Sequence, residues 1–270
     1  MAFLQLDKKI GSFFSSFNGQ DIKKERELID KNKKKIIGFY GLQGGVGVSS
    51  LIYQLALNIN KKILIFDTKL LSPYHYIYIK DKTRSTFQTY LFNELTAKKN
   101  TNSIELRNFI GTKGHVSFLY VPPTTMMDYL TLTQNNKGFT VITSLIHELT
   151  SLYDVIFIDI DMTNIDNFIG QGILNQIDSL IEISVPSLAC DLNREILRDL
   201  INKEVLKKRI INKVTEEGIY KNELGLPYEQ EYITNESYGE NYLKSLGCSD
   251  NFRKQFNIIT EVILNMIEGK

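Results

Sequence analysis

The sequence contains few of the residues that build disulfide or metal frameworks. Of its 270 residues, only 2 are cysteine and 3 are histidine. Cys190 and Cys248 are too few for a disulfide framework, and we expect both to be reduced thiols. The histidines show no ligand spacing with either cysteine, which argues against a structural zinc site. A chain of this length buries roughly 75% of its unfolded surface on folding, so it needs no such support.

The sequence also lacks an excess of one charge and any long apolar run. Lys and Arg number 32 against 31 Asp and Glu, which gives a net charge of +1. This balance argues against a protein that binds nucleic acid through bulk charge. No apolar run reaches the roughly 20 residues of a membrane span, and the N-terminus lacks a signal-peptide pattern. We therefore expect a cytoplasmic protein without a specific nucleic-acid partner.

The first 35 residues differ from the rest of the chain. Apolar side chains recur there at spacings of three and four, on one face of an expected helix: Phe3, Leu6, Ile10, Phe13, Phe14 and Phe17. Nine Lys and Arg minus five Asp and Glu leave this segment with a charge of +4. The helix docks on its own domain or on a partner, or it lies peripherally on the inner face of the membrane through residues 1–20, or the segment is disordered. We expect residues 1–35 to be this helix with a basic linker, and residues 36–270 to be one domain.

From residue 35 onward, short apolar runs alternate with stretches of helical periodicity. Strands are expected over residues 35–40, 63–67, 116–121, 154–159, 179–185 and 209–212. Helices are expected over residues 49–60, 85–97, 139–152, 191–206 and 251–269, with one more between 159 and 179. Buried strands that alternate with helices are typical of a parallel sheet covered on both faces. We therefore predict an α/β fold whose ligands bind at the carboxyl ends of the strands.

A glycine-rich stretch joins the first expected strand to the first helix. It reads Gly41-Leu42-Gln43-Gly44-Gly45-Val46-Gly47-Val48-Ser49-Ser50. Glycines let backbone N–H groups curl round an anion, and the helix N-terminus adds the positive end of its dipole. Ser49 or Ser50 can cap the helix, and Ser49 can instead ligate Mg²⁺. The stretch indicates a phosphate-binding loop, with a tight strand-to-helix turn as the alternative.

This loop resembles the KGGxGK[ST] loop of the ParA/MinD family of P-loop NTPases, and most closely that of the CpaE/TadZ branch associated with Flp/Tad-type pilus assembly. Other segments similar to the family are 63–67, 119–123, 153–159, 185–187 and 226–228. The resemblance implies a P-loop NTPase fold, a homodimer, and ATP with Mg²⁺ as the only cofactor. It implies nucleotide contacts from Gln43, Gly44, Gly45, Val46, Gly47, Val48, Ser49, Ser50, Asn212 and Pro227. It also implies Mg²⁺ ligation by Ser49, Asp67 and Asp159, although such residues also serve as strand-end caps.

Three positions depart from the family's pattern. Gln43 stands where a signature lysine reaches across the dimer, and Val48 where the ordinary P-loop has its lysine. Lys69 stands where the family has an aspartate near the attacking water. Because phosphoryl transfer depends on positioning and charge stabilisation, we expect little or no hydrolysis. The Lys69 ammonium either replaces missing positive charge, pairs with Asp159 or Asp161, or is solvated at a strand end.

The main hypothesis is a ParA/MinD-like pseudo-ATPase that acts as a localisation or assembly factor for a pilus or secretion apparatus. It would dimerise and dock protein partners of that machine. One alternative is a slow Mg-ATPase switch that cycles on a membrane or partner surface. The other is a ParA-like protein that positions DNA or other cargo. The lack of a strong basic face within the domain counts against DNA, because phosphate neutralisation needs clustered Lys and Arg.

Removal of residues 1–20 separates the two roles of the N-terminal helix. If the helix docks on protein, as we expect, the truncation exposes apolar surface and lowers the melting temperature. If it binds membrane, each lysine near anionic lipid adds about 1 kcal/mol of attraction. Truncation would then abolish flotation with anionic vesicles. Loss of flotation with an unchanged melting temperature would contradict our expectation.

Overall fold

The structure is a computed structural model that describes residues 35–69, 110–119, 134–197, 205–214, 224–229, 242–244 and 248–269. The expected N-terminal helix lies outside the described residues. So do the helix expected over 85–97 and residues 120–123 of one family-like segment.

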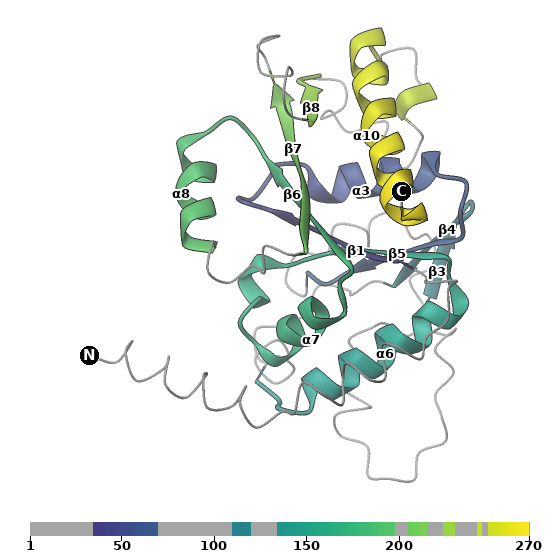
Figure 1. Cartoon of the computed structure of the whole chain (residues 1–270), viewed down its shortest axis with the longest axis vertical. Coiled ribbons are helices and arrows are strands. Elements are labelled where there is room, and N and C mark those ends of the chain that lie inside the picture. Colours follow the sequence, from purple (N-terminus) through teal and green to yellow (C-terminus); the bar gives the residue numbers. More distant parts are fainter. Residues whose placement is uncertain are drawn as a thin grey trace. The chain divides into compact units, whose positions relative to one another are not determined.

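Eight strands form one sheet in the order β3-β4-β2-β5-β1-β6-β7-β8 (Figure 1). They are β1 (Lys35–Gly41), β2 (Ile63–Asp67), β3 (Ile110–Lys113), β4 (Val116–Leu119), β5 (Val155–Asp159), β6 (Ser179–Ser184), β7 (Leu206–Val214) and β8 (Leu224–Pro227). Neighbouring strands are parallel except β3 and β4, which form an antiparallel pair. The mostly parallel α/β fold is therefore as predicted.

Two strands with continuous apolar runs occupy the middle of the sheet. β2 and β5 are buried along their whole length, as expected of strands covered on both faces. In the register, Asp159 at the end of β5 pairs with Phe39 of β1 and with Asp67 of β2. The carboxyl ends of the three strands therefore meet at one edge of the sheet.

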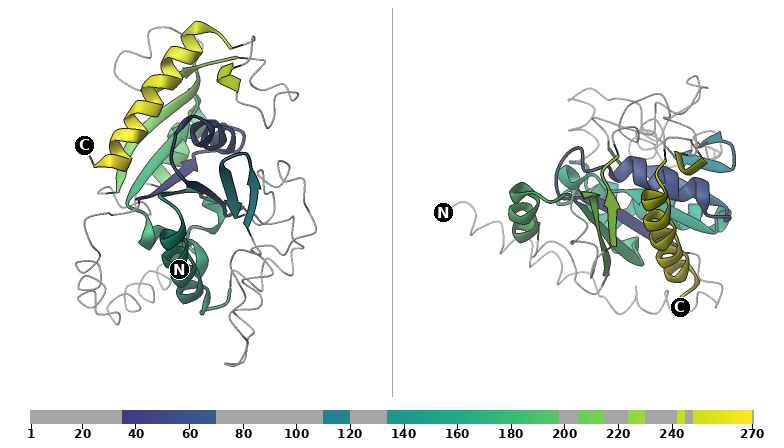
Figure 2. Two further views of the ribbon diagram at one scale, coloured as in Figure 1. Left: turned by 90° about the vertical axis from the view of Figure 1, so that its right-hand side faces the viewer. Right: turned by 90° about the horizontal axis from the view of Figure 1, so that it is seen from above.

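Helices cover both faces of the sheet. They are α3 (Val48–Asn58), α6 (Gly138–Leu152), α7 (Phe168–Gln176), α8 (Leu188–Leu197) and α10 (Asp250–Glu268), with short 3-10 turns η3 (Met162–Asn164) and η6 (Tyr242–Lys244). α3 connects β1 to β2, whereas α6 and α7 lead to strands in the opposite direction across the sheet. Because such crossovers are right-handed, α3 lies on one face and α6 with α7 on the other. Figures 1 and 2 show this arrangement, with α10 on the side of α3.

The contact between α6 and α7 depends on a glycine. A Cβ added to Gly172 would overlap the Cγ2 atom of Ile142 and lie 3.1 Å from the carbonyl oxygen of Phe139. The α7 backbone therefore approaches α6 more closely than a side chain allows. The C-terminal helix α10, expected from the sequence over residues 251–269, packs on β8. Within the described part of the chain, no helix has the length and apolar character needed to span a bilayer.

The structure corrects the sequence analysis at three places. β3 was not expected; it forms a hairpin with β4 through Gly114, whose φ of 62° suits glycine. Leu226 and Pro227, part of the family-like segment 226–228, belong to β8, a strand that was not expected. The helix expected over 191–206 is wrong at both ends, since α8 begins at Leu188 and β7 begins at Leu206, which pairs with Leu180 of β6.

Candidate phosphate-binding site

The glycine-rich loop connects the end of β1 to the start of α3. Gly45 and Gly47 have φ angles of 75° and 91°, in the left-handed region that L-residues rarely adopt. Gly47 is the residue that precedes α3, and no side chain caps the helix there. A Cβ added to Gly47 would lie 2.5 Å from the Nδ2 atom of Asn212. Glycine is therefore required at Gly47 both for its backbone angle and for the approach of Asn212.

Two side chains from the end of β7 hold the carbonyls of this loop. Asn212 Nδ2 donates to the Val46 oxygen at 2.8 Å, and Lys213 Nζ donates to the Gly45 oxygen at 2.7 Å. In a trans peptide the N–H of the next residue points away from the carbonyl. The N–H groups of Val46 and Gly47 therefore point away from these two side chains. This orientation is the one that a backbone anion site needs.

The first half of the loop is tied to α8 and the residue before it. Asn193 Nδ2 donates to the Leu42 oxygen, and Ser187 Oγ donates to Gln43 Oε1 at 3.2 Å. Arg194 holds the same helix to the sheet through an ion pair with the buried Glu182, with 2.9 Å between Nε and Oε1. Gln43, in the signature-lysine position, is therefore bonded within its own chain.

Apolar side chains fill the inside of the turn. Val46 and Val48 are buried, and their Cγ2 atoms lie 2.7 and 2.9 Å from where a Cβ on Gly41 would be. Val48 stands in the ordinary P-loop lysine position, and it packs towards the strand rather than offering a charge. Positive charge at this site must therefore come from residues outside the loop.

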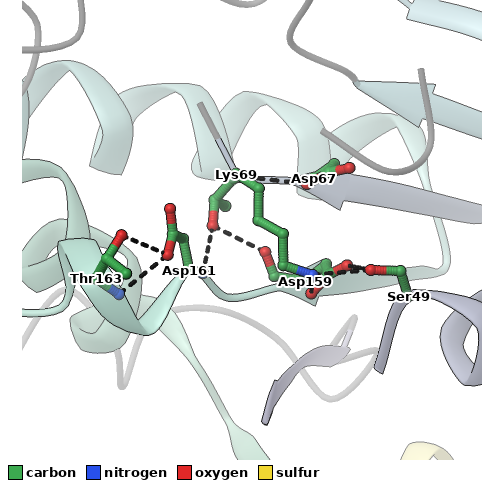
Figure 3. A network of polar contacts seen from close by, with 7 residues as sticks. Ser49, Asp67, Lys69, Asp159, Asp161 and Thr163 are labelled. Carbon is green, nitrogen blue, oxygen red and sulfur yellow. Dashed lines mark hydrogen bonds and ion pairs between the residues drawn. The ribbon is translucent and has the colours of Figure 1, made fainter. Parts of the chain in front are cut away.

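Lys69, two residues beyond β2, brings such a charge (Figure 3). Its Nζ atom lies 2.6 Å from Asp159 Oδ1 and donates to Ser49 Oγ at 2.8 Å. Ser49 Oγ in turn donates to Asp159 Oδ2. Burial by itself lowers the pKa of Lys69, but the negative charges of Asp159 and Asp67 outweigh it and raise that pKa above its ordinary value. Lys69 is therefore an ammonium ion, and its pairing with Asp159, one of the roles left open above, is confirmed.

The strand ends around this ion pair are also linked to one another. Asp67 and Asp159 are both fully buried, and Asp67 Oδ1 accepts the Lys69 backbone N–H at 3.1 Å. Thr68 Oγ1 donates to the Asp159 carbonyl at 2.8 Å and accepts the N–H of Asp161 at 2.9 Å. Asp161 Oδ1 then caps η3 by accepting from Thr163. The Lys69 backbone is thus fixed at the edge of the sheet.

The structure brings most of the expected site residues to one place. Ser49 contacts Asp159 directly, Asp67 pairs with Asp159 in the sheet register, and Asn212 lies against the loop. Pro227 ends β8 opposite Val214. Among the described residues, no group of three His, Cys, Asp or Glu side chains is arranged to hold a metal ion. Nucleotide contacts and Mg²⁺ ligation remain predictions.

The sequence analysis missed Lys213. Its position directly after Asn212 was the available signal, because the end of β7 reaches the same edge of the sheet. Its φ of 57° is unusual for a residue other than glycine, and its ammonium bonds the loop from outside.

No family model and no curated protein matches the sequence. Solved structures do match the fold. A ParA family ATPase from Chlorobium tepidum superposes with a TM-score of 0.65 at 19% identity, over 85% of this chain and 99% of the other. The septum site-determining protein MinD of Pyrococcus horikoshii, complexed with Mg-ADP, has a TM-score of 0.63 at 17% identity, over 86% and 96%. A plasmid partition protein from Borrelia burgdorferi has a TM-score of 0.59 at 19% identity, over 86% and 99%.

The chain has the fold of the ParA/MinD ATPases. The glycine-rich loop between β1 and α3 lies where the sequence predicts a phosphate-binding loop, and its binding of phosphate stays a prediction. The identities lie below 20%, so the side chains of this chain decide what chemistry the loop supports.

We expect Lys69→Met to lower the free energy of unfolding by about 2–4 kcal/mol, because it leaves the buried Asp159 carboxylate without its cation. Lys213→Met is the matched control. It removes a lysine that bonds only a carbonyl of the glycine-rich loop, and should cost less than about 1 kcal/mol. Urea denaturation of both variants measures the difference. Equal losses would contradict a special role for the Lys69 ion pair.

Proposed function

We propose that this chain is a ParA/MinD-like pseudo-ATPase of the CpaE/TadZ type. It acts as a localisation or assembly factor for a pilus or secretion apparatus, in the cytoplasm or at the inner face of the membrane. It works as a homodimer that docks partner proteins, and not by turnover. The observation that carries the proposal is a glycine-rich strand-to-helix loop in which Val48 is buried, next to a Lys69 ammonium that is paired with Asp159.

Binding of an adenine nucleotide is supported by the backbone of the loop. Asn212 and Lys213 bond the carbonyls of Val46 and Gly45. The N–H groups of Val46 and Gly47 therefore point away from these two side chains. The N-terminus of the 11-residue helix α3 adds its dipole at the same point. A MinD with this fold binds Mg-ADP. These features favour a phosphate ligand over a merely structural turn.

The absence of efficient turnover is supported by three side chains. Val48 is buried where a lysine would stabilise charge on the phosphates, and Gln43 is bonded to Ser187. Lys69 is bonded to Asp159 and Ser49 in place of an aspartate near the attacking water. Phosphoryl transfer relies on such charges for orders of magnitude in rate. This arrangement favours a binding protein over the slow Mg-ATPase alternative.

Protein docking is supported by an apolar stripe on α8. Leu188, Leu192 and Ile196 repeat every four residues and are 74%, 57% and 70% exposed. Contiguous exposed apolar side chains mark interaction surfaces. The same helix bonds the phosphate loop through Asn193. The family resemblance implies dimerisation through the face that carries the loop. We therefore infer that a second copy of the chain packs on this stripe.

Phosphate release from purified protein, with and without ATP and its candidate partner machinery, tests the pseudo-ATPase proposal. We expect background rates. Adding lysines by Gln43→Lys and Val48→Lys should improve nucleotide binding without restoring turnover while Lys69 remains. Turnover near 1 s⁻¹, the low end of usual enzyme rates, would instead support the Mg-ATPase switch.

Sedimentation velocity tests the dimer. We expect a dimer whose formation depends little on ATP, because no signature lysine reaches across to a partner's nucleotide. Leu192→Asp should shift the protein to monomer by placing a charge in the apolar interface. Ile258→Asp is the matched control, since Ile258 is an exposed apolar residue on α10. A wild-type monomer that dimerises only with ATP would contradict the proposal.

A further inference from the structure

Lys69 Nζ bonds the two residues of this chain that match the metal ligands of P-loop NTPases. In those proteins the loop Ser or Thr and a strand-end Asp bind Mg²⁺. The matching residues here are Ser49 and Asp159. Lys69 Nζ bonds both of them, at 2.8 Å and 2.6 Å, and the remaining Asp159 oxygen accepts the Ser49 hydroxyl (Figure 3).

These residues do not fit a magnesium ion as they stand. Mg²⁺ requires near-octahedral oxygen ligands at about 2.0–2.1 Å. Ser49 Oγ and both Asp159 carboxylate oxygens are already bonded to groups of the chain. A divalent ion would also lie beside an ammonium ion of the same charge sign. Binding of the metal would therefore require Lys69 to leave.

Lys69 is also held in place and can be reached. Its backbone N–H bonds Asp67, and its side chain is 26% exposed, so solvent reaches part of that side chain. An ammonium has three donors. Among the described residues two of them meet Ser49 and Asp159, which leaves one for an incoming phosphate oxygen.

We propose that Lys69 is a built-in replacement for the divalent cation, so that this chain binds a nucleoside triphosphate without Mg²⁺. The proposal rests on the proposed nucleotide binding and specifies its metal requirement. The cation at this site is part of the protein. Mg²⁺ is therefore excluded from the wild-type site and can enter it only when the lysine is removed.

Calorimetric titration of ATP in EDTA and in MgCl₂ tests this. Wild-type affinity should differ by less than about 3-fold between the two conditions. Lys69→Ala should lose about 10-fold or more in EDTA and recover with Mg²⁺. Lys213→Ala is the control, and any loss it shows should be the same in both conditions. A wild-type affinity for ATP that rises about 10-fold or more with Mg²⁺ would overturn the proposal, whatever the variants show.

A second measurement does not depend on nucleotide. The melting temperature of Lys69→Ala without ATP should rise when Mg²⁺ is added, because the metal enters between Ser49 and Asp159, whereas that of the wild type should not. Mg²⁺ that stabilises both proteins equally, or neither, would overturn the proposal. If wild-type protein bound no ATP in either buffer, the proposed nucleotide binding would fail. The melting temperatures would then still decide whether Lys69 occupies a cation site.

Discussion

Asp159 carries its carboxylate at a point that solvent does not reach, at the end of the central strand β5. A buried carboxylate is costly unless an opposite charge and hydrogen bonds satisfy it. Lys69 and Ser49 satisfy its two oxygens, and Thr68 bonds its backbone carbonyl. The segment after β2, the end of β5 and the first turn of α3 are therefore joined at one residue. Because α3 is fixed there, the loop that leads into it is fixed as well.

Much of the fold could be predicted because its central strands are apolar along their whole length and must be covered on both faces. β2 and β5 are short continuous apolar runs, and such runs between helices indicate a parallel sheet. The strands that were missed, β3 and β8, are at the two edges of the sheet and have four residues each. Gly111 in β3 and Pro227 in β8 have low strand propensity. Pairing with a neighbouring strand, which the sequence does not reveal, determines their structure.

The site could be predicted in part. The family resemblance implies Ser49, Asp67 and Asp159 as one set, and the structure brings them together because parallel strands end at the same edge of the sheet. The direction of the Lys69 side chain was left open, because a lysine after a strand can extend towards solvent or fold back. The Lys69 side chain folds back because its ammonium pairs with the buried carboxylate of Asp159. Lys213 was missed because its bond to the Gly45 carbonyl joins residues that are far apart in the sequence.

Whether the cation next to the loop is a metal ion or the Lys69 ammonium determines whether the loop can work as a nucleotide switch. In a nucleotide switch, the metal and the terminal phosphate arrive and leave together, and the loops that they hold relax after hydrolysis. Under the proposal, the cation at Ser49 and Asp159 belongs to the protein and does not dissociate together with the ligand. Asn193 bonds α8 to the loop. If the cation stays in place as proposed, the α8 stripe would keep one arrangement, which suits a constant docking surface better than a timed release.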